Sequence, residues 1–143
     1  MPQQYEKNET PDTLSISFPS ELDLVPRAVN DALSFVLEKA AGIDQFSFKL
    51  ALFESLTNAA KHGCHFNPEL AIKLNIEIKK SSVDIVIADD GEGFDWRKQL
   101  KDSEEPQDAE IASGRGLFIL KSYNFNPSYN DKGNVLSLRI ELA

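Results

Sequence analysis

The sequence lacks the features that mark secreted, membrane-spanning and nucleic-acid-binding proteins. Cys64 is the only cysteine in 143 residues, so no disulfide can form within the chain, which fits a reducing compartment. No apolar run approaches the ~20 residues that a membrane span needs, and the polar N-terminus lacks the apolar segment of a signal peptide. Lys and Arg number 15 against 23 Asp and Glu, a net charge of −8, so a phosphate backbone would be repelled. These absences predict a cytoplasmic protein with no membrane partner and no direct nucleic-acid partner.

What remains is enough for one folded domain. Hydrophobic residues make up 41% of the chain and charged residues 27%, values close to globular averages. We expect residues 1–12 to be a flexible leader and residues 13–143 to form a single domain.

The apolar spacing alternates between strand and helix patterns. It predicts strands over residues 14–18, 71–78, 83–89 and 135–140, and helices over residues 22–40 and 44–62. A short polar turn between residues 78 and 83 indicates an antiparallel hairpin. Helices followed by an antiparallel-rich sheet favour a two-layer α/β (α+β) sandwich over a doubly wound parallel fold.

The second predicted helix carries an apolar face and a polar stripe. We expect the apolar arc to face the sheet; its residues are Phe46, Leu50, Leu52, Phe53, Leu56 and Ala60. Glu54, Asn58 and His62 form the stripe. A carboxylate one turn before a carboxamide suits a base beside a magnesium ligand, while a solvated helix face is the alternative. His62 could simply complement the dipole at the helix end.

Two glycine-containing clusters follow. Asp89-Asp90-Gly91-Glu92-Gly93-Phe94 comes directly after a strand, where an aspartate could accept from an exocyclic amine and glycines allow a planar ligand to approach the backbone. An ordinary acidic turn is the alternative, and the spacing of a calcium loop is absent.

The second of these clusters is Ser113-Gly114-Arg115-Gly116-Leu117, at the start of a predicted helix. Backbone N–H groups there could bind an anion, whereas a flexible connection is the alternative reading. The cluster matches neither a P-loop nor a dinucleotide-binding fingerprint. Residues 95–113 before it are polar and acidic, which predicts a mobile lid.

Taken in order, the three clusters resemble the N, G1 and G2 boxes of the GHKL ATPase family. The N box reads Glu54-Ser-Leu-Thr-Asn58-Ala-Ala-Lys-His62-Gly63, the G1 box Asp89-Asp-Gly91-Glu-Gly93-Phe94 and the G2 box Gly114-Arg-Gly116-Leu117. The resemblance covers about residues 14–142 and is closest to bacterial anti-sigma-factor serine/threonine kinases. It implies the GHKL (Bergerat) fold, with helices packed on a mixed, mostly antiparallel sheet.

The resemblance also implies roles for individual residues, with ATP and Mg²⁺ as cofactors. Glu54 would be the general base and Asn58 the magnesium ligand. Asp89 would bind the adenine amino group, in a purine pocket shaped by Gly91 and Gly93. The backbone of Gly114, Arg115, Gly116 and Leu117 would hold the phosphates. Where relatives carry a Thr beside the glycine of the last turn, this chain has Asn134.

The function implied by the resemblance is phosphorylation of a serine on a small anti-anti-sigma partner. Such kinases regulate transcription by partner switching, bind a sigma factor and commonly form homodimers. Arg27 stands where relatives often carry an arginine near a partner interface, although a solvated helix residue is the alternative.

Two other functions of the same fold compete with this one. A non-catalytic nucleotide-binding module would sequester partners without phosphorylating them, and the presence of Glu54 argues modestly against it. A sensor histidine kinase would need an upstream helical hairpin with a phospho-acceptor histidine. The only histidines are His62 and His65, and we expect no room for that hairpin before residue 13.

Overall fold

A computed structural model describes residues 4–40, 42–91, 125–130 and 132–142. Its strands form a six-stranded sheet in the order β1-β2-β3-β4-β6-β5. The strands are β1 Glu6–Glu9, β2 Thr13–Pro19, β3 Ala71–Ile78, β4 Ser82–Asp89, β5 Ser128–Tyr129 and β6 Val135–Glu141. The helical elements are η1 Leu22–Leu24, α1 Val25–Lys39, α2 Gln45–Asn58 and η2 Ala59–Gly63.

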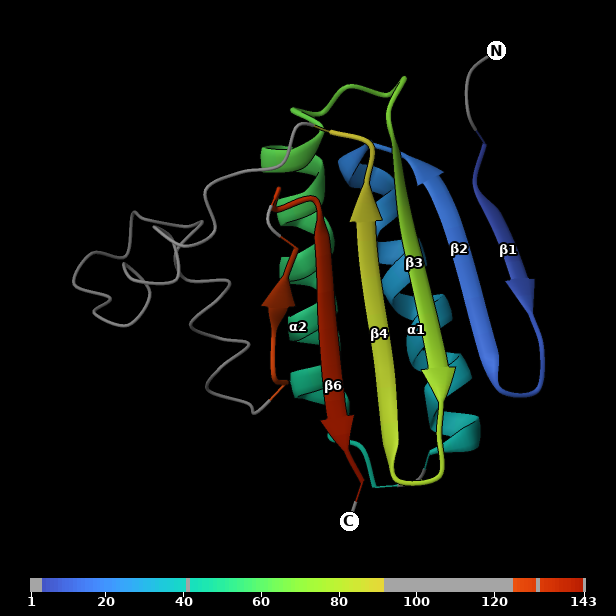
Figure 1. Cartoon of the computed structure of the whole chain (residues 1–143). Helices are drawn as coiled ribbons and strands as arrows, with labels where there is room; N and C mark the ends of the chain where they lie inside the picture. Colours follow the sequence, from blue (N-terminus) through green and yellow to red (C-terminus); the bar gives the residue numbers. More distant parts are fainter. Residues whose placement is uncertain (1–3, 41, 92–124, 131, 143) are drawn as a thin grey trace.

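The molecule has two layers, because α1 and α2 both lie on one face of the sheet (Figure 1). Alternate strand residues point into the core between the layers, and Leu14, Ile16 and Phe18 of β2 are at most 1% exposed. The opposite sheet face carries polar residues such as Lys73 and Asn75 on β3. This confirms the predicted two-layer α+β sandwich. The resemblance implied a mixed, mostly antiparallel sheet, and every pairing between described strands is antiparallel.

The predicted N-terminal leader is wrong for residues 6–9, which form β1 and pair with β2. All four residues are exposed, so the strand leaves no apolar alternation for the sequence to reveal. Side chains of α1 hold the chain just before it. The Tyr5 hydroxyl donates to Asp31 Oδ2 at 2.6 Å, and the Arg27 guanidinium lies 3.8 Å from the centre of the Tyr5 ring.

Helix α2 begins where the sequence predicts, at the Asp44 cap. The Asp44 carboxylate accepts from the backbone N–H of Phe46 at 3.0 Å. Hydrogen bonding, first of all from the Ser47 side chain, holds the pKa of Asp44 below its ordinary value.

The predicted apolar face of α2 is only partly correct. Leu52, Leu56 and Ala60 are completely buried, whereas Phe46 and Phe53 are 66% and 45% exposed. Together with Leu50, these two aromatic residues line a groove beside Pro26 and Val29 of α1. The helix therefore has two apolar faces, and periodicity alone cannot tell which of them the sheet covers.

The end of α2 widens into the π-helical turn η2. The backbone N–H of Cys64 bonds to the carbonyl oxygen of Ala59 at 3.0 Å, a wider ring than an α-helix closes. This turn packs against β4 and brings Gly63 to the end of that strand.

Candidate functional site

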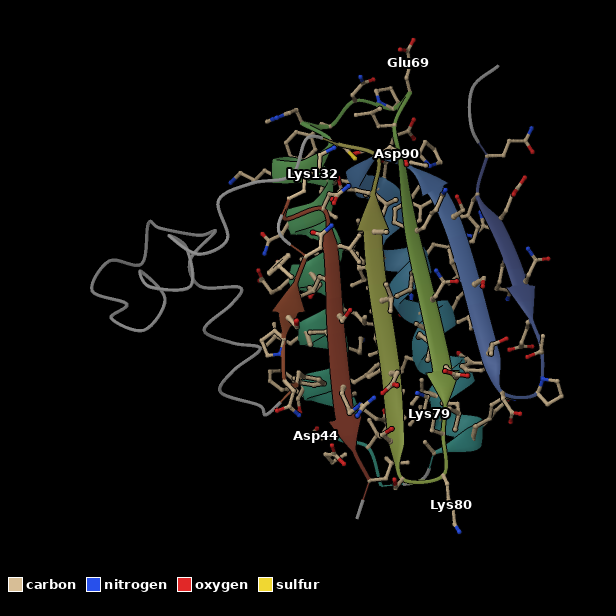
Figure 2. The ribbon with its side chains drawn as sticks, in the orientation of Figure 1. Asp44, Glu69, Lys79, Lys80, Asp90 and Lys132 are labelled. Carbon is tan, nitrogen blue, oxygen red and sulfur yellow. The ribbon has the colours of Figure 1, made fainter. Side chains whose placement is uncertain are left out.

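A small pocket lies at one end of the sheet, between the end of α2, the end of β4 and the β5–β6 hairpin. Figure 2 labels Asp90 and Lys132 at this end of the molecule, and Asp44 and Lys79 at the other. The pocket encloses a cavity of about 10 Å³, the space that one water molecule needs. Its lining residues are Ser55, Asn58, Ala59, Gly63, Ile87, Asp89, Tyr129, Gly133, Asn134 and Leu136.

Asp89 is the charged group of the pocket. Its side chain belongs to the inward face of β4, and the residue is only 9% exposed. One oxygen, Oδ1, accepts from the backbone N–H of Gly91 at 2.8 Å. Burial, assisted by the negative charge of Asp90, raises the pKa of Asp89 despite that hydrogen bond. The result is a fixed, desolvated acceptor that faces the pocket.

Two glycines make room for this carboxylate. A Cβ on Gly63 would overlap the Asp89 carboxylate, and a Cβ on Gly91 would overlap the carbonyl oxygen of Gly63. Gly91 was predicted as a site residue, whereas Gly63 was named only as the last residue of the N box and was given no role. Its function depends on the contact between η2 and β4, which no local sequence signal reveals.

The β5–β6 hairpin closes the pocket and is tied to Asp89 through Asn134. The backbone N–H of Asp89 donates to the Asn134 carbonyl at 3.0 Å, and Asn134 Nδ2 donates to the Asp89 carbonyl at 3.2 Å. Asn134 Oδ1 accepts from Asn130 Nδ2 at 2.7 Å, which fixes the amide. Asn134 therefore positions Asp89.

Tyr129 contributes another wall of the pocket that the sequence did not single out. Burial, followed by the charge of Asp89, raises the pKa of its phenol. The ring is therefore neutral at every physiological pH.

Glu54 and Asn58 lie one turn apart on α2, and both are half-buried. Asn58 lines the same pocket as Asp89, while Glu54 lies outside the lining set. Within the described ranges, no group of three or more His, Cys, Asp or Glu residues gathers as a metal site. An amide oxygen with one nearby carboxylate suits Mg²⁺ that arrives with substrate phosphates rather than a cage made only of protein ligands.

Part of the predicted site falls outside the described residues. This applies to Gly93, to the lid at residues 95–113 and to the phosphate-binding cluster of Gly114, Arg115, Gly116 and Leu117. His62 lies in η2, with a side chain that is also outside the description. The roles given to these residues stay predictions.

Comparison with known proteins shows which family this chain resembles. The features that matter are the sheet order, the polar end of α2 and the buried aspartate at the end of β4. A family model for the histidine kinase-like ATPase domain matches residues 18–140. The chain belongs to this family. The match confirms the predicted GHKL ATPase relationship and covers the described pocket from α2 to β6.

Curated relatives of this ATPase domain include serine-protein kinases. The serine-protein kinase RsbW of Staphylococcus epidermidis is 30% identical over 138 residues, which cover 90% of this chain and 86% of that protein. RsbW of Oceanobacillus iheyensis is 30% identical over 93 residues, which cover 62% of this chain and 59% of that protein.

A solved structure supports the fold. The mycobacterial sensor histidine kinase MprB aligns with a TM-score of 0.54 and 18% sequence identity, over 82% of this chain and 93% of that one. In the described part of this ATPase domain, no helix has the length and apolar character that a bilayer span requires.

Proposed function

We propose that this chain is an ATP-dependent serine/threonine-protein kinase that phosphorylates a small anti-anti-sigma-type protein. The observation that carries the proposal is the buried Asp89 carboxylate, which shares one pocket with Asn58 of α2. The similarity to serine-protein kinases over nine-tenths of the chain supports the same reaction class.

Adenine recognition is assigned to Asp89. Its desolvated carboxylate accepts hydrogen bonds only, so it pairs with the 6-amino group of adenine and disfavours the 6-oxo group of guanine. Gly91 lets the ring approach the backbone, and Gly93 is assigned the same role. The backbone N–H groups of residues 114–117 are assigned to the phosphates.

Asn58 fits the role of magnesium ligand. Its amide oxygen is a hard, neutral donor, and it lies at the wall of the pocket rather than in a closed cage. When bound, Mg²⁺ neutralises phosphate charge and fixes the geometry of the phosphates. Asn58 would hold the ion through its side-chain amide oxygen.

Glu54 is assigned as the general base. A protein substrate places its seryl hydroxyl near α2, and the Glu54 carboxylate accepts the proton as the hydroxyl oxygen attacks the terminal phosphoryl group. Half-burial of Glu54 restricts its rotamers while leaving it accessible to a partner. The acceptor must come from the partner, so the kinase acts only within a protein complex.

Regulation of transcription would then run through protein partners in the cytoplasm. The net charge of −8 disfavours direct DNA contact. The partners that we propose are an anti-anti-sigma substrate, a sigma factor and a second copy of the chain.

Phosphoryl transfer to a partner tests this function. The full chain is incubated with radiolabelled ATP, Mg²⁺ and candidate anti-anti-sigma proteins. We expect the wild type to label the partner. The control variant Glu38→Gln should label it equally well, because it removes a carboxylate from the exposed face of α1, where the Glu38 side chain is 74% exposed. Glu54→Gln should bind ATP but label the partner at least about 100-fold more slowly.

Two results would contradict the proposal. Full activity of Glu54→Gln would remove Glu54 from the base role. Tight partner binding without any labelling would favour the non-catalytic nucleotide-binding module.

A further inference from the structure

An unpartnered hydroxyl lies in the wall of the pocket. Ser55 is 3% exposed and lies on the buried face of α2 that also carries Phe48 and Leu52. Its Oγ atom has no hydrogen-bond partner among the described residues. Because Ser55 lines the pocket together with Asp89, this hydroxyl belongs to the site rather than to the core.

The usual role of a serine inside a helix does not apply here. Such a hydroxyl commonly donates to the carbonyl oxygen one turn earlier, which would be that of Ala51, yet no such bond is present. A buried hydroxyl without a partner is unfavourable. A polar ligand at the pocket would supply the missing partner.

We propose that Ser55 is an adenine-binding residue that donates a hydrogen bond to ring atom N1 of adenine, directly or through one water. Adenine presents a donor, the 6-amino group, beside an acceptor, N1. Asp89 can only accept and Ser55 can donate, so the two residues match this edge. The Ser55 hydroxyl can also accept, so discrimination against a 6-oxo base comes from Asp89. Guanine and hypoxanthine present the opposite order, an acceptor at position 6 and a donor at N1.

The geometry of the pocket agrees with this division of roles. The Asn134 side chain already makes hydrogen bonds with Asn130 and with the backbone of Asp89. It therefore positions the site, and other residues recognise the base. The cavity of about 10 Å³ accommodates the one water that would bridge Ser55 to a base seated against Asp89. This inference rests on the ATP site proposed above.

Calorimetric titration of the full chain separates Ser55 from a merely structural role. The ligands are ATP and 1-deaza-ATP, in which a C–H group replaces N1. We expect Ser55→Ala to bind ATP about 5-fold more weakly than the wild type, the loss of one ordinary hydrogen bond. Wild type and Ser55→Ala should bind 1-deaza-ATP with equal affinity.

Thr57→Val is the matched control. Thr57 also carries a buried hydroxyl without a described partner, but it lies outside the pocket lining. We expect the affinity of this variant for both ligands to equal that of the wild type. Thermal unfolding of each variant checks that the fold is intact.

The possible outcomes separate this inference from the proposed function. Unchanged ATP affinity of Ser55→Ala would overturn the role of Ser55 and leave the ATP site standing. An equal loss for ATP and 1-deaza-ATP would also overturn it, because the effect would then not pass through N1. A wild-type chain that binds no ATP would overturn both.

Discussion

At the scale of single residues, the Asp89 carboxylate is held from several sides. Gly91 donates to it, Gly63 packs directly against it, and Asn134 bonds to its backbone. A carboxylate fixed in this way binds a ligand amine without losing further rotamer entropy. Substitutions at Asp89 and at its glycine neighbour therefore test the site most directly.

We predict that Asp89→Asn weakens ATP binding at least 10-fold. The amide replaces half of the acceptor with a donor, which opposes the 6-amino group of adenine. Asp90→Asn is the matched control, because Asp90 is exposed and its side chain bonds to the backbone of Ala71 at 3.2 Å. Calorimetry should show near-wild-type affinity for the control. Equal affinities of the two variants would remove Asp89 from the adenine site.

We also predict that Gly63→Ala reduces ATP affinity by about 10-fold or more. The added methyl group overlaps the Asp89 carboxylate, so the side chain must turn away from its present position. Lys49→Ala, an exposed change earlier on α2, should leave the affinity unchanged. If Gly63→Ala remains folded by circular dichroism and binds ATP normally, the contact between Gly63 and Asp89 does not determine the site.

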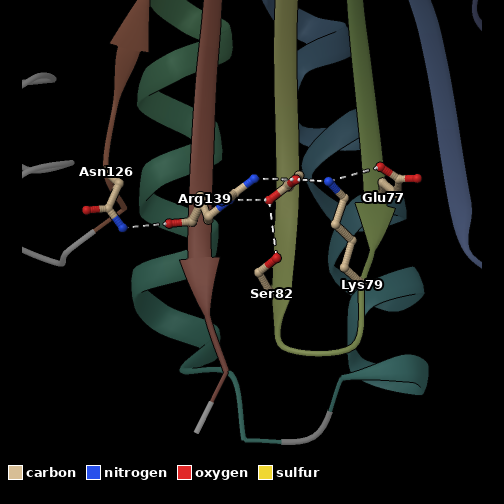
Figure 3. A network of polar contacts seen from close by, with 6 residues as sticks. Glu77, Lys79, Ser82, Asn126 and Arg139 are labelled. Atoms are coloured by element: carbon tan, nitrogen blue, oxygen red, sulfur yellow. Dashed lines mark hydrogen bonds and ion pairs between the residues drawn. The ribbon is translucent and has the colours of Figure 1, made fainter.

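At the scale of elements, a network of charges joins β3, β4 and β6 on the face of the sheet that the helices leave open (Figure 3). Arg139 donates to both oxygens of Asp84, from Nε at 2.9 Å and from a terminal nitrogen at 3.2 Å. Lys79 Nζ lies 2.8 Å from Asp84 Oδ2. Asp84 and Arg139 are also direct cross-strand partners, so the network fixes the register of the sheet.

We predict that Asp84→Asn lowers the free energy of unfolding by roughly 1 kcal/mol at pH 7. Hydrogen bonds from Arg139, followed by Lys79, hold the pKa of Asp84 below its ordinary value. A lowered folded-state pKa stabilises the fold above the unfolded-state value of about 4, and that contribution is lost as the pH falls through the folded-state pKa.

Urea unfolding of the wild type and Asp84→Asn over a pH series measures this effect. The difference between the two proteins should be largest near neutral pH and shrink below about pH 4. Glu38→Gln, which removes an exposed carboxylate, should match the wild type throughout. A difference that does not change with pH would mean that Asp84 acts through packing rather than charge.

The same elements show which parts of the fold the sequence could reveal. β2, β3, β4 and β6 alternate apolar and polar residues because one sheet face is buried and the other open, so their positions were predicted. β1 was missed because an exposed edge strand is held by backbone bonds and carries no such alternation. The burial of Phe48 instead of Phe46 was missed because the packing of α1 against α2, rather than periodicity, decides which face is covered.

The candidate site divides in a similar way. Asn58, Asp89 and Gly91 carry a recognisable spacing, and the structure brings Asn58 and Asp89 into one pocket. The other residues of the site are Gly63, Ser55 and Asn134. They reach the pocket because η2, α2 and the last hairpin pack against β4, and these long-range contacts leave no local pattern in the sequence.

At the scale of the whole molecule, the pocket is built from elements that share one core. Its walls come from α2, β4 and the β5–β6 hairpin, and residues of all these elements belong to the same buried cluster. Opening the pocket therefore disturbs the packing of the entire sandwich. A ligand that binds there should stabilise the domain as one cooperative unit.

We predict that Mg²⁺-ATP at 100 times its dissociation constant adds about 2.7 kcal/mol to the free energy of unfolding. For a domain of this size, that corresponds to a rise in Tm of roughly 6–12 °C. Asp84 lies near the other end of β4 from Asp89, roughly 17 Å away along the strand, so Asp84→Asn should lower Tm without ATP and leave the ATP-dependent rise intact. Asp89→Asn should lose most of the rise. Differential scanning calorimetry of the three proteins, with and without ATP, measures these changes in Tm. An ATP-dependent rise in Tm that survives in Asp89→Asn would place the nucleotide elsewhere on the molecule.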